Sequence, residues 1–112
     1  MPVEKVSPEL DRIVPPNPKI EILAEGFGGD QGPAEGPLWW KEGGYLLFSD
    51  IHNNQRMKWS PQDGVSVFLE PTNRANGLTR DLQGRLIACE HETRRVTRLE
   101  LDGSLTVLAN TY

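Results

Sequence analysis

The chain has 112 residues, enough for one small domain, and 37% hydrophobic and 25% charged residues are ordinary for a globular protein. The 16 acidic residues outnumber the 12 basic ones and give a net charge of -4, which argues against a nucleic-acid partner. No apolar run approaches the roughly 20 residues that span a bilayer, so no membrane partner is expected. Residues 1–14 lack a secretory apolar segment, and a lone cysteine suits a reducing compartment, so we expect a cytoplasmic protein.

Residues 1–19 are predicted to form an N-terminal arm. Their prolines remove backbone donors and fix φ, which favours extended or turning chain. A short helical turn over residues 8–13, capped by Ser7, is compatible with this composition, and a poorly ordered terminus is the alternative. Residues 20–24 then alternate well enough to predict a strand, and a glycine-rich loop follows over residues 26–32.

An internal repeat is the strongest feature of the sequence. Gly43 and Gly84, which are 41 residues apart, each precede an apolar run. The pairs 63–64 and 102–103 are both Asp-Gly, lie 39 residues apart, and each precede an alternating run. Asp-Gly suits the positive φ angles of a tight hairpin turn. The two units therefore share one plan of four short strands joined by tight turns.

Four antiparallel strands in about 40 residues are typical of a β-propeller blade. The second strand of each unit, residues 46–48 and 86–89, is apolar on both faces, as expected inside a stack of sheets. We therefore predict an all-β fold in which residues 20–112 form the first two blades of a propeller. A sandwich is the weaker alternative. Because propellers have about 4–8 blades, we expect a longer protein, with two self-assembling units as the alternative.

Two residues at equivalent places in the units are candidates for a site. Glu35 precedes the first strand of its unit, and Asn76 occupies the same place 41 residues later. We expect them to converge on the inner side of the blades, where a hard cation can take oxygen ligands. Arg74 can fork onto a carboxylate or a hydroxyl-rich ligand. A solvated loop glutamate and a simple Asn-Gly turn remain open as alternatives.

Three neighbouring residues end the apolar run of the second unit. Glu90 and His91 could contact a ligand as a carboxylate and an imidazole. Adjacent strand residues point to opposite faces, so at most one of them faces a given pocket, and a hydrogen-bonded blade corner is the alternative. Cys89 lies within the apolar run, so we expect an inert buried thiol.

The same segments resemble the senescence marker protein/gluconolactonase/luciferin-regenerating-enzyme superfamily over residues 20–112. The matching strings are AEGPLW at 34–39, LLFSDI at 46–51 and RANGLTRDLQGRL at 74–86. The run 85–91, followed by Arg94-Arg95-Val96, is most similar to the bacterial gluconolactonase branch. The resemblance implies a six-bladed propeller, of which this chain holds roughly the first third.

The resemblance also implies an activity. Members of this superfamily hydrolyse sugar lactones and bind one divalent cation in the central channel, often calcium, with zinc, magnesium or manganese as alternatives. Carried over residue by residue, Glu35 is a metal ligand and Arg74 and Asn76 contact the lactone; Glu90 and His91 are further candidates for substrate contact. The family's other ligands, an Asn and an Asp, and its general base are expected beyond residue 112, so this part alone should be inactive. A propeller that binds without turnover is the alternative function.

Overall fold

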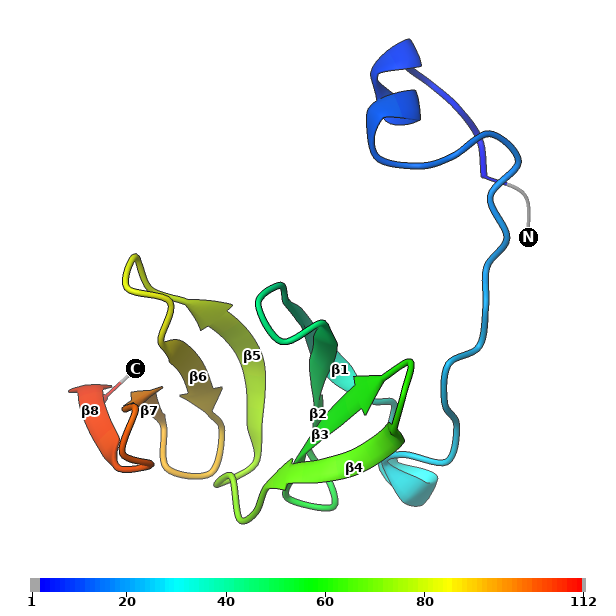
Figure 1. Ribbon diagram of the computed structural model, residues 1–112. Coiled ribbons are helices and arrows are strands. Elements are labelled where there is room, and N and C mark those ends of the chain that lie inside the picture. Colours follow the sequence, from blue (N-terminus) through cyan, green and yellow to red (C-terminus); the bar gives the residue numbers. More distant parts are fainter. Residues whose placement is uncertain (1–2, 112) are drawn as a thin grey trace.

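Two four-stranded antiparallel sheets make up the folded part of the computed structural model, which describes residues 3–111. We call them blade 1 and blade 2. Their strands pair in chain order, as Figure 1 shows. Blade 1 contains β1 (Glu35–Trp40), β2 (Tyr45–Asp50), β3 (Gln55–Ser60) and β4 (Gly64–Leu69); blade 2 contains β5 (Ala75–Arg80), β6 (Leu86–Glu90), β7 (Arg95–Leu99) and β8 (Leu105–Ala109).

The predicted blades and their hairpin turns are confirmed. Gly64 and Gly103, the glycines of the two Asp-Gly pairs, have φ angles of 67° and 86°. These left-handed values are unfavourable for a residue with a Cβ, so glycine allows the chain to reverse tightly in both hairpins. Each unit of the repeat therefore folds as one blade.

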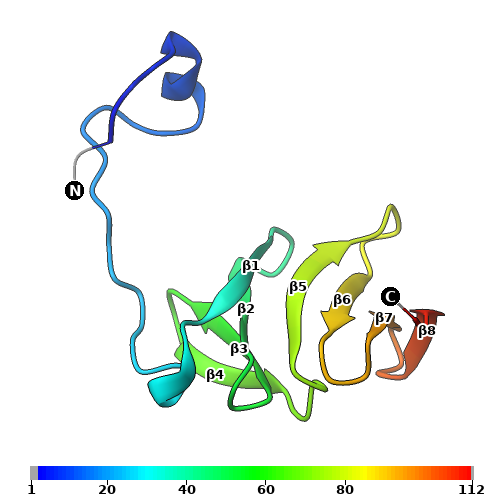
Figure 2. The same cartoon turned by 180° about the vertical axis from the view of Figure 1, so that it is seen from behind.

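The blades pack face against face, with β1 and β5 lying next to each other where they meet (Figures 1 and 2). Leu47 of β2 is 0% exposed, and Leu86 and Ala88 of β6 are buried opposite blade 1. Because side chains alternate along a strand, one face of each sheet supplies this apolar contact. The contact between the blades is thus the main core of the described chain.

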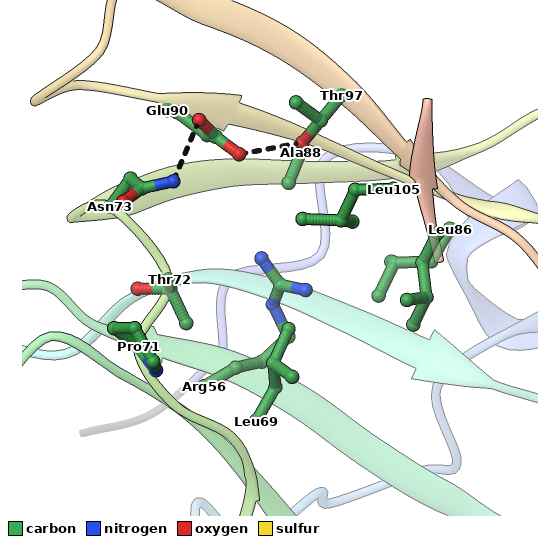
Figure 3. A pocket seen from close by; sticks show the side chains of 11 residues that line it. Arg56, Leu69, Pro71, Thr72, Asn73, Leu86, Ala88, Glu90, Thr97 and Leu105 are labelled. Atoms are coloured by element: carbon green, nitrogen blue, oxygen red, sulfur yellow. Dashed lines mark hydrogen bonds between the residues drawn. The ribbon is translucent and has the colours of Figure 1, made fainter. Parts of the chain in front are cut away.

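A buried arginine interrupts this apolar contact. Arg56 of β3 is 3% exposed and lines a cavity of about 10 Å³ between the blades, which Figure 3 shows from close by. Burial lowers the pKa of Arg56 to about 10, while the nearby Glu90 carboxylate acts in the opposite direction. Its Nε atom has no hydrogen-bond partner among residues 3–111. A cavity of this size is comparable to one water molecule.

A second link between the blades lies at the last residues of β1 and β5, the inner strands of the two blades. The rings of Trp40 and Tyr45 stack with centroids 6.1 Å apart. The guanidinium of Arg80, from blade 2, lies 3.9 Å from the Trp40 ring centroid and donates to Glu42 at 2.7 Å. The hydrogen bond from Arg80 lowers the pKa of Glu42. Arg80 therefore clamps the turn of blade 1 to the edge of blade 2.

The N-terminal segment differs in part from expectation. A 3₁₀ helix at Pro8–Arg12 is capped by the Ser7 hydroxyl, which confirms the predicted helical turn. The strand predicted over residues 20–24 is wrong: this segment pairs with no strand of the described chain, and Ile22 is 77% exposed. Alternation alone does not make a strand, because the backbone also needs a sheet edge to pair with.

The first strand of blade 1, β1, begins at Glu35. The N-terminal arm extends away from the sheets in both views (Figures 1 and 2), whereas the Phe27 ring packs edge-on against Phe48 of β2 with centroids 5.0 Å apart and the Gly28 N–H donates to Asp50 at 2.9 Å. Residues 1–2 of the predicted arm and residue 112 of the predicted blade region lie outside the described residues. Over residues 3–111, no helix is both long and apolar enough to cross a membrane.

Replacing Arg80 by alanine should lower the stability of the protein by about 1 kcal/mol, because a cation held over a tryptophan ring contributes roughly that much. Arg12→Ala serves as the control, since Arg12 lies on the exposed arm and pairs with Glu9 there. Urea unfolding followed by tryptophan fluorescence measures both. Equal midpoints for wild type and Arg80→Ala would show that the clamp contributes nothing.

Candidate functional site

Both inner strands carry a β-bulge near their first residues. In blade 1, Glu35 pairs with Ser49 and Leu38 with Leu47, so three steps on β1 match two on β2. In blade 2, Ala75 pairs with Glu90 and Leu78 with Ala88, which is the same irregularity. A bulge bends its strand and re-aims the side chains beside it. The repeat therefore places a matching bulge at the same end of each inner strand.

The side chains of Glu35 and Asn76 converge at these bulges. The Asn76 Nδ2 donates to the Glu35 Oε2 at 3.1 Å. The Ser49 hydroxyl, from the strand paired with Glu35, donates to the Asn76 carbonyl at 2.7 Å. Ser49 is 1% exposed, so this contact is buried beneath the exposed Glu35. The predicted convergence of Glu35 and Asn76 is confirmed.

Gly36 makes this convergence possible. Its φ angle is 61°, and a Cβ placed on it would lie 2.2 Å from the Asn76 carbonyl oxygen. That separation is far inside van der Waals contact, so β1 and β5 approach this closely only because position 36 has no side chain. The Glu-Gly-Pro string thus combines a carboxylate with the glycine that brings it to Asn76.

Arg74 lies just before β5, two residues from Asn76. It is exposed, has a left-handed φ of 53°, and is separated from Asn76 by the buried Ala75. Its carbonyl accepts the backbone N–H of His91 at 3.3 Å, which ties it to the end of β6. The connection between the blades therefore delivers Arg74 to the same end of β5 as Asn76.

Glu90 occupies a hydrogen-bonded corner of blade 2, which was the alternative left open by the sequence. It is 2% exposed and accepts hydrogen bonds from Thr97 Oγ1 at 3.0 Å and from Arg95 Nη2 at 2.9 Å, with Thr93 and Asn73 as further donors. Burial by itself would raise the pKa of Glu90, but these hydrogen bonds outweigh it and lower the pKa below its ordinary value. The neighbouring His91 is exposed.

Cys89 corrects one expectation, because its thiol is exposed rather than buried. Leu86, Ala88 and Glu90 face blade 1, and the period of two along β6 turns Cys89 to the opposite face. That face of blade 2 has no neighbouring blade within the described residues. An apolar run predicts burial only when sheets cover both of its faces.

The atoms of Glu35 and Asn76 that could bind a metal ion are carboxylate and amide oxygens. No cluster of three or more His, Cys, Asp or Glu side chains able to hold a metal ion occurs within residues 3–111. Glu35 therefore brings one carboxylate, with the Asn76 amide beside it, and this pair can form only part of a coordination shell. The sequence did not indicate Ser49, which donates to the Asn76 carbonyl, or Asn54, whose amide oxygen accepts the Arg74 N–H at 2.8 Å. The register of β1 against β2 would have indicated Ser49, since it faces Glu35 across the hairpin.

Comparison with known proteins identifies the family. The family model for the SMP-30/gluconolactonase/LRE-like region matches residues 33–112. The chain belongs to this family. Within it, a gluconolactonase of Zymomonas mobilis is 33% identical over a match that covers 88% of this chain and 30% of that protein.

Two solved structures of the gluconolactonase family resemble the chain. An X-ray structure of a family protein from the Northeast Structural Genomics Consortium matches 96% of this chain and 36% of its own, with a TM-score of 0.78 at 30% identity. The gluconolactonase of Xanthomonas campestris, described as important in glucose secondary metabolic pathways, matches 70% of this chain and 27% of its own, with a TM-score of 0.63 at 39% identity. The chain thus spans about a third of the length of these relatives.

Gly36→Ala should separate Glu35 from Asn76 and destabilise the protein more than Gly44→Ala. Both glycines are left-handed, at φ 61° and 65°, so both variants carry the strain of about 1–2 kcal/mol expected for an L-residue there. Only at position 36 would the new Cβ meet a neighbouring backbone, whereas nothing lies within 4 Å at Gly44. Urea midpoints for the two variants measure the difference, and equal losses would contradict the close approach.

Glu90 should make stability depend on pH in the acid range. Its folded-state pKa lies below the ordinary 4.5, so its contribution is complete above that pH and is lost as pH falls through the lower folded-state value. The stability difference between wild type and Glu90→Gln should therefore shrink between about pH 6 and about pH 3. The exposed Glu92→Gln is the control. A difference that stays constant over this range would contradict the assigned shift.

Proposed function

We propose that the protein carrying this chain hydrolyses sugar lactones with the help of a divalent cation. The observation that carries this proposal is the meeting of Glu35 and Asn76 at equivalent bulges of two adjacent inner strands. Membership of the gluconolactonase-like family supports the reaction class, and the names of its relatives support a sugar lactone as the substrate. In this proposal the chain supplies two blades of a larger propeller.

Glu35 is the proposed metal ligand of this chain. It is exposed at the inner end of β1 and offers carboxylate oxygens, the donors that hard cations such as calcium prefer. Calcium is the first choice on this chemistry, and magnesium, manganese and zinc also accept oxygen ligands. A divalent cation bound there would polarise the lactone carbonyl and stabilise negative charge on its oxygen. In this proposal the remaining ligands and the general base come from outside the described residues.

Asn76 and Arg74 are the proposed substrate contacts. An amide both donates and accepts hydrogen bonds, which suits the hydroxyl groups of a sugar lactone. A guanidinium offers several donors in a fixed plane and orients an oxygen-rich ligand. The exposed His91 remains a candidate contact. The Glu90 carboxylate, by contrast, accepts hydrogen bonds from Arg95 and Thr97 of blade 2, so we assign Glu90 a structural role.

The chain has one cysteine, Cys89, and therefore no disulfide can form within it. Proteins of oxidising compartments commonly carry disulfides, whereas cytosolic thiols are kept reduced. We therefore propose a cytoplasmic location.

Glu35→Gln should weaken calcium binding by about tenfold or more in the complete protein, because a neutral amide lacks the charge that holds a hard dication. Isothermal titration with calcium measures the affinity, and proton release from a sugar lactone measures hydrolysis. Glu21→Gln, on the exposed segment before the blades, is the matched control.

Unchanged calcium affinity in Glu35→Gln would contradict the ligand role. If the wild-type protein binds calcium and the lactone but releases no protons, it is a binding module rather than an enzyme. Loss of both binding and hydrolysis in Glu35→Gln alone is the result expected for the proposed function.

A further inference from the structure

The linker between the blades, residues 70–74, is held in an unfavourable backbone conformation just before β5. Asn73 and Arg74 are consecutive residues with φ angles of 54° and 53°. Residues with a Cβ rarely adopt left-handed angles, and two in succession persist only when surrounding contacts enforce them. This conformation precedes β5 directly, so it determines where Arg74 and the start of that strand lie.

One side chain of blade 1 accepts three of the hydrogen bonds that hold this segment. The Oδ1 atom of Asn54 accepts the backbone N–H of Arg74 at 2.8 Å, the backbone N–H of Thr72 at 3.1 Å and the Thr72 hydroxyl at 3.3 Å. Asn54 ends the turn between β2 and β3 and has a φ of 60°, a left-handed angle that asparagine tolerates better than most residues. A single amide oxygen thus holds both ends of the segment 72–74.

Blade 2 holds the same linker from its other side. Asn73 Nδ2 donates to Glu90 at 3.1 Å, and Figure 3 shows Asn73 turned toward this carboxylate. The Asn73 carbonyl accepts the N–H of Glu92 at 3.0 Å. These bonds fix Asn73 to the corner of blade 2, while the N–H of Arg74 is satisfied from blade 1. The position of Arg74 therefore depends on both blades at once.

We propose that Asn54 is a positioning residue that presents Arg74 to the substrate, an inference that rests on the substrate role proposed above for Arg74. Asn54 acts through the backbone of Arg74 and touches neither Glu35 nor Asn76 in any hydrogen bond described here. The Asn54 amide oxygen holds the Arg74 backbone in its left-handed conformation. The Arg74 side chain therefore extends from one backbone position rather than from many. Without this acceptor, ordering Arg74 would have to occur on binding and would weaken affinity.

Asn54→Gly removes the acceptor while keeping the left-handed backbone free of strain, since glycine adopts φ 60° readily. Asn54→Asp keeps an oxygen in the same place and should rescue the function. Gln55→Ala is the matched control, because Gln55 follows Asn54 as the first residue of β3 and donates to Glu70 at the start of the linker, away from Arg74. Arg74→Ala reports the substrate role itself.

Two readouts on the complete protein are required. Amide hydrogen exchange should accelerate at Thr72 and Arg74 in Asn54→Gly by about tenfold or more, with β6 and β7 unchanged. Steady-state hydrolysis of a sugar lactone should show a KM raised about tenfold and a kcat within about twofold of wild type, since a lost orientation of a binding group acts on binding. Gln55→Ala and Asn54→Asp should match wild type in both.

The outcomes separate the inference from the function on which it rests. Wild-type exchange at Arg74 in Asn54→Gly, or an equal KM increase in Asn54→Asp, would overturn the positioning role. A wild-type KM in Asn54→Gly together with a raised KM in Arg74→Ala would overturn it as well. A wild-type KM in Arg74→Ala would instead refute the proposed substrate role, and the exchange result would still decide whether Asn54 holds the linker. Should Asn54→Gly fail to fold, Asn54→Asp alone tests the acceptor, because loss of activity in that variant contradicts it.

Discussion

The close approach of Gly36 to the Asn76 carbonyl is the contact on which the site depends. It requires a residue without a Cβ on β1, and the buried Ser49 hydroxyl satisfies the carbonyl that is brought into the interface. Both bulges lie at this approach, so the geometry that joins the blades also brings the Glu35 carboxylate to the Asn76 amide. The contact that packs the blades together is therefore also the contact that assembles the site.

The interface between the blades buries one charged residue from each blade. Arg56 and Glu90 come from different blades, and the Glu90 carboxylate favours the charged form of Arg56 where water is largely excluded. Glu90 is fully supported by hydroxyl, amide and guanidinium donors, whereas the Nε of Arg56 is left without a hydrogen-bond partner in the described chain. The hydrogen bonds to Glu90 come from blade 2 and from the linker, so they fix the corner of blade 2 that faces Arg56. The linker that carries Arg74 is attached to the same carboxylate through Asn73.

Much of the fold was predictable because local sequence patterns determine its turns and strands. Asp-Gly pairs and the glycines near residues 43 and 84 determine the turns, the alternation of side chains determines the strands, and the repeat determines that there are two blades. The register of the repeat also placed Glu35 and Asn76 together, because equivalent residues of adjacent blades lie at the same end of their inner strands. These conclusions need only short-range geometry and the period of a strand.

Tertiary structure alone decided which faces are covered and which loop atoms meet. Cys89 is exposed because its side of β6 faces away from blade 1, and the alternating residues 20–24 form no strand because no described edge accepts them. The choice of the blade corner for Glu90, and of Asn54 as the acceptor for Arg74, depends on loops that are distant in sequence and adjacent only after the blades pack. Local sequence determined each blade, whereas contacts across the interface determined what each polar side chain does, because a hydrogen bond requires a partner in a fixed place.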